Sequence, residues 1–128
     1  MDYYGALFLI GRVLLGGYFL RSAYNHFVNV KQLAGYAASK GVPAPQLAVI
    51  GSGLLLLVGG VGILLDRFIE FSVLALVLFF IPVTFTMHRY WKETDPSMKA
   101  LQSVNFYKNL ALLGAVLMLL IILQPCGY

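Results

Sequence analysis

The chain has 128 residues and a net charge of +4, and 60% of its residues are hydrophobic while only 11% are charged. About a quarter of the residues in a soluble domain carry charge, so this composition excludes a water-soluble globular domain and predicts an integral membrane protein. The basic residues are spread among apolar segments and form no single stripe, so the positive charge does not indicate nucleic-acid binding.

The first apolar segment, residues 3–24, is long enough to cross a bilayer and contains two arginines, Arg12 and Arg21. No basic region precedes it, so we interpret it as a retained helix and not as a cleaved signal peptide. Arg12 and His26 share one helical face with small and aromatic residues between them. This pattern predicts that the face with Arg12 is turned into the bundle and away from lipid.

The second predicted helix, residues 45–65, begins at prolines that suit a first helical turn, and its glycines are expected to permit close helix packing. Only Asp66 and Arg67 separate it from the third predicted helix, residues 68–87. These two helices must therefore form an antiparallel hairpin with a tight turn. Pro82 is expected to kink the third helix.

Two connecting segments are expected to form short interfacial helices. In residues 29–39 apolar side chains recur at helical spacing, and Gly41 is placed to end the helix. Asp95 is expected to cap a second short helix, which precedes the fourth transmembrane helix at residues 106–123. The sequence therefore predicts an all-α integral membrane protein, a four-transmembrane-helix bundle with short interfacial helices, as a single domain over residues 1–128.

The basic residues of the connections favour one orientation in the membrane. Most of them follow the first and third predicted helices, while the opposite side holds only Arg67. Because basic loops tend to stay in the cytoplasm, we expect both termini on the outer side of the membrane. Cys126, the only cysteine, would then face outward; an intramolecular disulfide is excluded, and an intermolecular disulfide, lipidation or an inert thiol remain open.

Polar residues gather at one end of three predicted helices. His26 ends the first helix, His88 ends the third, and Lys108 lies in the first turn of the fourth. We expect one site here with aromatic residues around it, built from Arg12, His26, His88, Trp91, Asn105, Lys108 and Asn109. Such a site could bind an anion, or hydrogen-bond the oxygens of a quinone whose ring stacks on the aromatic residues.

A purely structural interpretation stands beside this one. His, Lys, Trp and Tyr are common at membrane interfaces because they combine an apolar body with a polar tip. Arg12 could instead hydrogen-bond backbone carbonyls freed near Pro82. Other candidate partners for it are the hydroxyl groups of Ser52, Ser72 and Thr84. Two histidines without a nearby carboxylate or cysteine do not indicate a metal site, so neither a metal nor haem is predicted.

Several short motifs occur in a characteristic order along the chain. They are Gly11-Arg12, Leu15-Gly16, Lys40-Gly41-Val42-Pro43, Gly59-Gly60, His88, and Phe106 followed by Lys108-Asn109-Leu110-Ala111. In this order the sequence resembles the DoxX family over nearly its whole length. The resemblance implies a four-helix protein of the bacterial or archaeal cytoplasmic membrane, with relatives linked to terminal quinol oxidase, thiosulfate:quinone oxidoreduction and redox-defence complexes.

The resemblance also implies which positions matter. They are Gly11, Arg12, Gly16, Gly59, Gly60, His88, Lys108 and Asn109. Many relatives carry a glutamate just before the glycine pair, where this sequence has three leucines, residues 55–57. Arg12 therefore lacks the carboxylate expected from the family, which favours a bound ligand or a backbone partner over an ion pair or proton relay.

Three hypotheses about function follow. The preferred one is a quinone-linked oxidoreductase subunit with a site lined by Arg12, His26, His88 and Lys108. In this hypothesis His88 or Lys108 would hydrogen-bond or protonate the quinone. A partner redox subunit would supply the electrons. The alternatives are an assembly or scaffold subunit, and a small anion transporter whose path is marked by Arg12 and Lys108. Membrane lipids surround the chain in each case, a homodimer is compatible with its size, and no nucleic-acid partner is expected.

Overall fold

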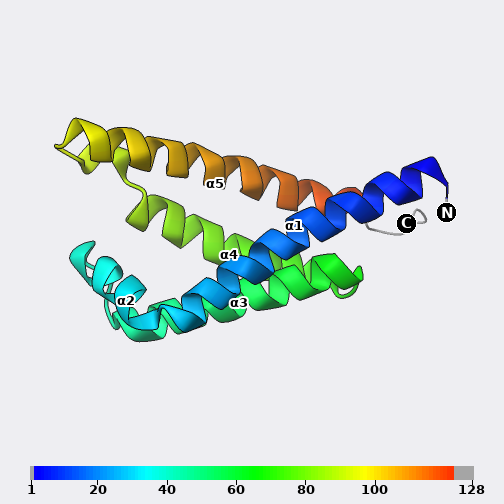
Figure 1. Ribbon diagram of the computed structural model, residues 1–128, viewed down its shortest axis with the longest axis horizontal. Coiled ribbons are helices and arrows are strands. Elements are labelled where there is room, and N and C mark those ends of the chain that lie inside the picture. The colour runs from blue at the N-terminus through cyan, green and yellow to red at the C-terminus, as the bar shows by residue number, and fades with distance from the viewer. Residues whose placement is uncertain (1, 123–128) are drawn as a thin grey trace.

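The computed structural model describes residues 2–122, and every regular element within this range is helical. Figure 1 shows the long helices, which are α1 (Tyr3–Val28), α3 (Pro45–Leu65), α4 (Ile69–Met87) and α5 (Pro96–Ile122). Two short elements lie in the connections, namely α2 (Val30–Ser39) and the 3₁₀ helix η1 (Tyr90–Lys92). The long helices are apolar and long enough to cross a membrane, so the chain is an all-α, multi-pass membrane protein.

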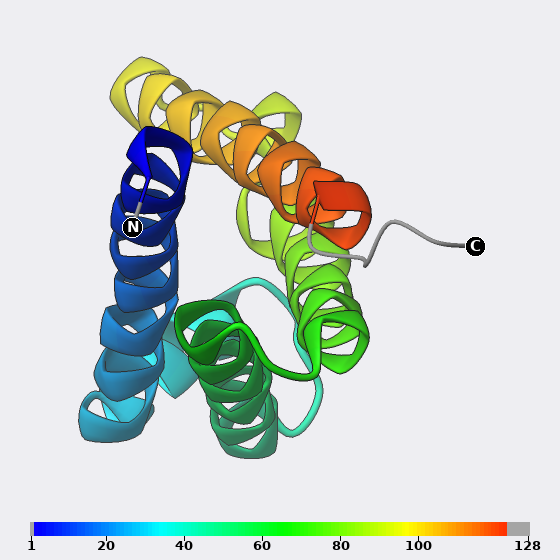
Figure 2. The ribbon, with the colours of Figure 1, turned by 90° about the vertical axis from the view of Figure 1, so that its right-hand side faces the viewer.

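The long helices pack in sequence order. Helix α1 packs on α3, α3 on α4 and α4 on α5, whereas α1 and α5 make no extensive contact. Figure 2, a view along the bundle, shows the four helices around a common centre. In Figure 1, α1 and α5 diverge toward the end of the molecule that holds α2, which we call the α2 end. The opposite end, where α3 turns into α4 at Asp66, is called the Asp66 end.

A single apolar core joins all four long helices. Its most buried side chains are at most 2% exposed and are Phe19, Ala23, Leu56, Ile63, Leu76, Phe80 and Val116. The rings of Phe19 in α1 and Phe80 in α4 meet edge to face, with centroids 5.8 Å apart. Lipid tails are as apolar as these side chains, so close packing holds the helices together in the membrane.

The glycines of α3 let this helix approach both of its neighbours. A Cβ added to Gly60 would lie 3.1 Å from the carbonyl oxygen of Gly16 and 3.0 Å from the side chain of Leu20, both in α1. A Cβ on Gly62 would overlap the side chain of Ser72 in α4. The predicted role of these glycines in helix packing is therefore what the structure shows.

Several predicted boundaries agree with the structure because they depend on local signals. Helix α3 has the predicted bounds, and α4 begins one residue later than predicted. The tight hairpin between them is present, with Asp66 and Phe68 both in the left-handed backbone region. The chain leaves α2 at Gly41, whose φ of 81° suits a residue without a side chain.

The fourth span differs from the prediction. A separate short helix before residue 106 was expected, but α5 is one continuous helix from Pro96 to Ile122. No proline or glycine interrupts residues 97–113, so nothing in this segment ends a helix that has begun. Asp95 does cap the start of α5, where its side-chain oxygen accepts the backbone N–H of Ser97 at 3.4 Å.

Candidate binding cavity

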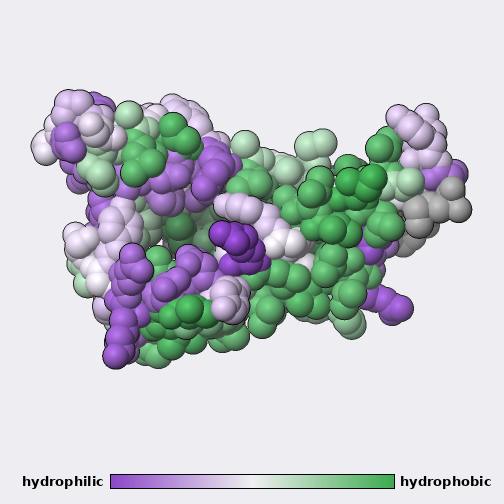
Figure 3. Space-filling model, viewed as in Figure 1, coloured by the Kyte–Doolittle hydropathy of each residue, from purple (hydrophilic) through white to green (hydrophobic). Residues whose placement is uncertain are grey.

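A cavity of about 660 Å³ lies at the α2 end, lined by residues from α1 to α5. Figure 3 shows a hollow on this part of the molecule, with hydrophilic residues around its rim and hydrophobic residues in its depth. The core side of the cavity is apolar and includes Phe19, Leu55, Leu56, Phe79, Phe80 and Val83. Its size is that of a small-molecule site, for which volumes of about 300–1,000 Å³ are typical.

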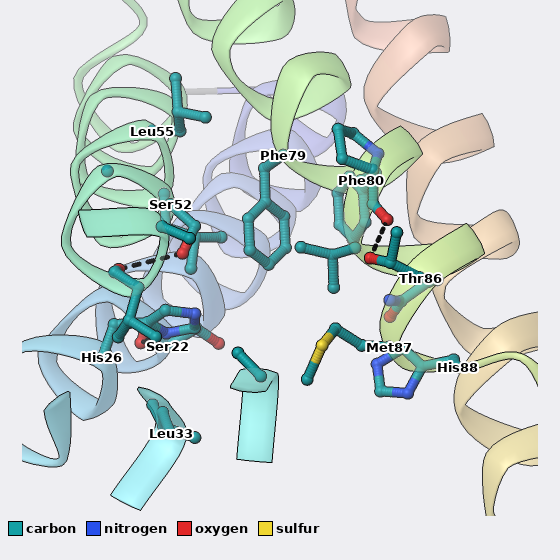
Figure 4. Close-up of a pocket in the computed structure, with 18 of the residues that line it drawn as sticks. Ser22, His26, Leu33, Ser52, Leu55, Phe79, Phe80, Thr86, Met87 and His88 are labelled. Carbon is teal, nitrogen blue, oxygen red and sulfur yellow. Dashed lines mark hydrogen bonds between the residues drawn. The ribbon is translucent and has the colours of Figure 1, made fainter. Parts of the chain in front are cut away.

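The structure brings the two histidines to this one cavity, as predicted. In Figure 4, His26 of α1 lies on one side of the cavity and His88, which follows α4, lies on the other. The ring of Phe79 packs edge-on against that of His26, with centroids 5.9 Å apart. Within residues 2–122, no three His, Cys, Asp or Glu side chains lie close enough together to hold a metal ion.

The hydrogen bond that His26 makes within α1 determines its tautomer, and with it which ring nitrogen can accept a hydrogen bond from a ligand. Its Nδ1 lies 2.8 Å from the backbone carbonyl oxygen of Ser22, one turn earlier in α1. A carbonyl oxygen only accepts, so Nδ1 must carry the hydrogen. In a neutral His26 the other nitrogen, Nε2, then has a free lone pair.

His88 is oriented by a network that joins three helices. Its Nδ1 lies 2.7 Å from Oε1 of Gln102 in α5, and the Gln102 amide nitrogen donates to the hydroxyl group of Tyr36 in α2. Gln102 is 2% exposed, so this network lies in the interior. With the amide oxygen as acceptor, Nδ1 of His88 carries the hydrogen and its Nε2 keeps a lone pair.

Gln102 and Tyr36 were missed by the sequence reasoning. Gln102 had a signal, because it shares one face of α5 with Asn105 and Asn109 at spacings of three and four residues. Tyr36 had none, since it recurs at helical spacing with the apolar residues of α2. Its role depends on α2 lying beside the ends of α4 and α5, which is a tertiary feature.

Helix α5 supplies the third polar part of the cavity lining. Asn105, Lys108 and Asn109 all border the cavity, as predicted for one helical face. Asn109 is only 6% exposed, and no other residue in the range 2–122 hydrogen-bonds its amide. Its amide atoms are not themselves buried, so they are open to the cavity and can hydrogen-bond a polar occupant.

Two of the hydroxyl groups in the lining donate to carbonyl oxygens of their own helices. Ser52 in α3 donates its hydrogen to the Val49 carbonyl at 3.0 Å, and Thr86 in α4 donates to the Pro82 carbonyl. Both bonds are drawn in Figure 4. The Ser52 and Thr86 hydrogens point back to their own helices, so these hydroxyl oxygens can offer the cavity only lone pairs.

A salt bridge and hydrogen bonds join the connection between α2 and α3 to the connection between α4 and α5. Lys40, after α2, forms a salt bridge with Glu93, after η1, at 2.5 Å. The Arg89 guanidinium donates to the Lys40 carbonyl oxygen at 3.2 Å and to the Thr86 carbonyl oxygen at 3.1 Å. The connection from α2 to α3 is thereby joined to the connection from α4 to α5.

Arg12 does not share the site of the histidines, contrary to the prediction. It donates to the carbonyl oxygens of Ile63 at 3.2 Å and Leu64 at 2.8 Å, in the last turn of α3 at the Asp66 end. Arg12 precedes His26 by 14 residues in the same helix. This spacing corresponds to about 21 Å along the axis. Arg12 instead borders a separate cavity of about 270 Å³, which shares no lining residue with the larger one.

The predicted partners of Arg12 need the same correction. Backbone carbonyls do bind it, as the missing glutamate favours, but these carbonyls belong to the end of α3 and not to the region of Pro82. The hydroxyl groups of Ser52 and Ser72 donate to other carbonyls, and the buried Thr84 hydroxyl has no partner among residues 2–122.

Trp91 lies outside the cavity, so its predicted place in the binding site was wrong. It is 47% exposed and packs against Tyr90 and Phe106, with ring centroids 5.2 Å and 5.4 Å away. The short helix η1 turns it away from the bundle interior. Together with Tyr107, these rings form a cluster typical of an aromatic belt at a membrane interface.

Comparison with known proteins gives one match. No match was found among curated proteins or among solved structures. A family model, DoxX, matches residues 7–89, which hold both histidines and nearly all of the chain from α1 to the end of α4. This segment is well over half of the 128 residues. The chain therefore belongs to the DoxX family.

Proposed function

We propose that the cavity binds the head of a quinone-type electron carrier, and that the protein is the quinone-binding membrane subunit of an oxidoreductase. The observation that carries the proposal is a cavity that combines an aromatic core side with polar groups on several walls, including the amide of Asn109, which no other residue in the range 2–122 hydrogen-bonds. A quinone head has the matching chemistry, since its flat apolar ring bears an oxygen at each end.

Each polar residue has a role in this proposal. His88, oriented by Gln102, and Lys108 would contact the oxygens of the head and exchange hydrogen bonds or protons with them. His26, Asn105 and Asn109 would hold the head from the other walls. A partner redox subunit would supply the electrons, because the proposal assigns no electron-carrying group to this chain.

The position of the cavity suits a carrier dissolved in the membrane. The hollow in Figure 3 lies on the long side of the molecule, where α1 and α5 diverge. A hydrophobic tail could therefore remain in lipid while the head enters sideways. In the proposed orientation, which the basic residues of the connections favour, the α2 end and the cavity lie in the cytoplasmic half of a bacterial or archaeal cytoplasmic membrane.

An assembly or scaffold subunit is the second candidate function. The observation that favours it is the exposure of the outer helices, since α1 buries only Gly16, Phe19 and Ala23 within the described chain. Such a helix offers long apolar faces to partner helices. An anion transporter receives less support, because Arg12 and Lys108 border different cavities that share no lining residue.

Filling the cavity should abolish binding without disturbing the bundle. Gly51 borders the cavity, and a Cβ added there would meet nothing within 4 Å, so a Gly51→Phe side chain has room to enter it. We expect saturable binding of a short-tailed benzoquinone to the wild-type protein in lipid nanodiscs, weakened at least about tenfold in Gly51→Phe. Equilibrium dialysis under controlled redox conditions measures it.

The matched control is Gly114→Phe. Gly114 also has nothing within 4 Å of an added Cβ, but it lies on the exposed face of α5 and borders neither cavity. Its variant should bind like wild type. The proposal would be rejected if the wild-type protein bound neither the oxidised nor the reduced carrier, or if both phenylalanine variants lost binding equally.

A further inference from the structure

Four polar side chains of the cavity lining are left as hydrogen-bond acceptors by the bonds that they make within the protein. Nδ1 of His26 donates to the Ser22 carbonyl oxygen and Nδ1 of His88 donates to Oε1 of Gln102, which leaves both Nε2 atoms as lone-pair acceptors in neutral rings. The hydroxyl groups of Ser52 and Thr86 donate to backbone carbonyls and likewise keep only lone pairs. These four side chains can therefore accept hydrogen bonds from donor groups of a ligand.

These acceptors lie on opposite walls. His26 and Ser52 come from α1 and α3 on one side of the cavity, and Thr86 and His88 come from the α4 side, as Figure 4 shows. Donors lie elsewhere in the lining: Lys108 on α5 can only donate, the Tyr36 hydroxyl on α2 accepts from Gln102 and can donate its own hydrogen, and the Asn25 amide keeps its NH2 group. The amide groups of Asn105 and Asn109 can serve in either role.

A ring with oxygens in para positions can reach both of the walls that carry acceptors. Its two oxygens point in opposite directions, so a hydroquinone can donate one O–H to each acceptor wall. The oxidised quinone has only carbonyl oxygens there, which accept and cannot donate. Resting on the proposed function, we infer that the cavity is selective for the reduced, dihydroxylated form of the carrier.

The inference is tested by comparing the two redox forms of one ligand. A decyl-substituted benzoquinone and its hydroquinone are titrated anaerobically against the protein in nanodiscs at pH 8, above the ordinary histidine pKa of about 6.5. We expect the hydroquinone to bind about tenfold more tightly, since each neutral hydrogen bond contributes on the order of 1 kcal/mol. Equal binding, or tighter binding of the quinone, overturns the inferred selectivity and leaves the proposed function standing. If neither form binds, both the inferred selectivity and the proposed function are rejected.

A pair of threonine variants assigns the selectivity to the cavity wall. Thr86→Val removes one acceptor and nearly preserves shape, so it should lower hydroquinone affinity about fivefold and leave quinone affinity unchanged. Thr84→Val is the control, because Thr84 is a buried threonine of the same helix that does not border the cavity. It should leave the ratio of the two affinities as in wild type; an equal change in both variants contradicts the inference.

His88→Phe gives an independent measurement. It keeps an aromatic ring at this position and removes the Nε2 acceptor, so the preference for hydroquinone should fall while quinone still binds. A His88→Phe protein that keeps the full preference would overturn the assignment of this nitrogen as an acceptor for the ligand.

Discussion

Arg12 shows how a charged side chain is accommodated inside a bundle without a carboxylate. Its two acceptors, the carbonyl oxygens of Ile63 and Leu64, belong to the last turn of α3, where the helix has free carbonyl groups and the negative end of its dipole. The Phe8 ring lies 5.8 Å from the guanidinium carbon and adds a cation–π contact. Arg12 therefore acts as a cap for a neighbouring helix.

This arrangement also indicates how deep Arg12 lies in the membrane. Helix α3 has 21 residues. At about 1.5 Å per residue it spans roughly 31 Å, which is the thickness of a bilayer core. A group bonded to its last turn lies near the edge of that core and not at its centre. The cost of placing the charge there is correspondingly smaller.

Replacing Arg12 should lower stability and leave the ligand cavity intact. Arg12→Met keeps the side-chain length but removes both donors, so we expect a loss of about 2 kcal/mol in the free energy of unfolding, seen as a lower Tm in detergent. Arg21→Met, at an exposed position of the same helix, should have a smaller effect. Loss of carrier binding in Arg12→Met at unchanged Tm would contradict the structural role.

At the scale of elements, α3 is the helix on which the bundle is built. It contacts α1 on one side and α4 on the other, and small residues at its contact points make both approaches possible. Helix α5, by contrast, contacts only α4 and η1 extensively and carries the polar stripe of Gln102, Asn105 and Asn109. The difference explains why packing is tight around α3 and why the cavity opens beside α5.

Adding one methyl group at two positions of α3 should have opposite effects. In Gly62→Ala the new Cβ would overlap Ser72 and approach the Arg67 carbonyl oxygen, so α4 must shift, at an expected cost of about 1–3 kcal/mol. In Gly51→Ala the new Cβ meets nothing within 4 Å, and the gain in helix propensity should leave stability equal or slightly higher. Thermal unfolding of both variants in the same detergent measures the difference, and similar Tm values would contradict the packing of α3 on α4.

At the scale of the whole molecule, three helix contacts close the bundle on most of its circumference and leave the side between α1 and α5 open at the α2 end. The core of Phe19, Leu56, Phe80 and Val116 remains buried despite this opening. A rigid apolar core is thus combined with a polar cavity at one end, an arrangement that can hold a head group in the protein and its tail in lipid.

The orientation of the whole molecule can be tested by labelling. In a Cys126→Ser background, Arg67→Cys places an exposed thiol at the Asp66 end and Thr94→Cys places one between η1 and α5. Because the basic connections favour the cytoplasm, we expect a membrane-impermeant maleimide to label only the Arg67→Cys protein in intact cells. Both thiols should react after the membrane is opened, which controls for reactivity. The reverse pattern would place the cavity in the outer half of the membrane.

The sequence by itself determined the features that depend on local chemistry. Apolar runs of bilayer length predicted the long helices, Pro45 and Gly41 predicted where segments begin and end, and the spacing of Asn105, Lys108 and Asn109 predicted one polar face of α5. These inferences succeed because hydrophobic length, backbone restriction and helical periodicity are properties of contiguous residues.

Only the tertiary structure decided which polar residues share a cavity. The separation of Arg12 from the histidines, the bond from Gln102 to both His88 and Tyr36, and the outward position of Trp91 depend on how segments distant in the chain tilt and pack against each other. Periodicity assigns a residue to a helix face, but it does not say which face of another helix it meets. The divergence of α1 and α5, which creates the cavity, is a property of that packing.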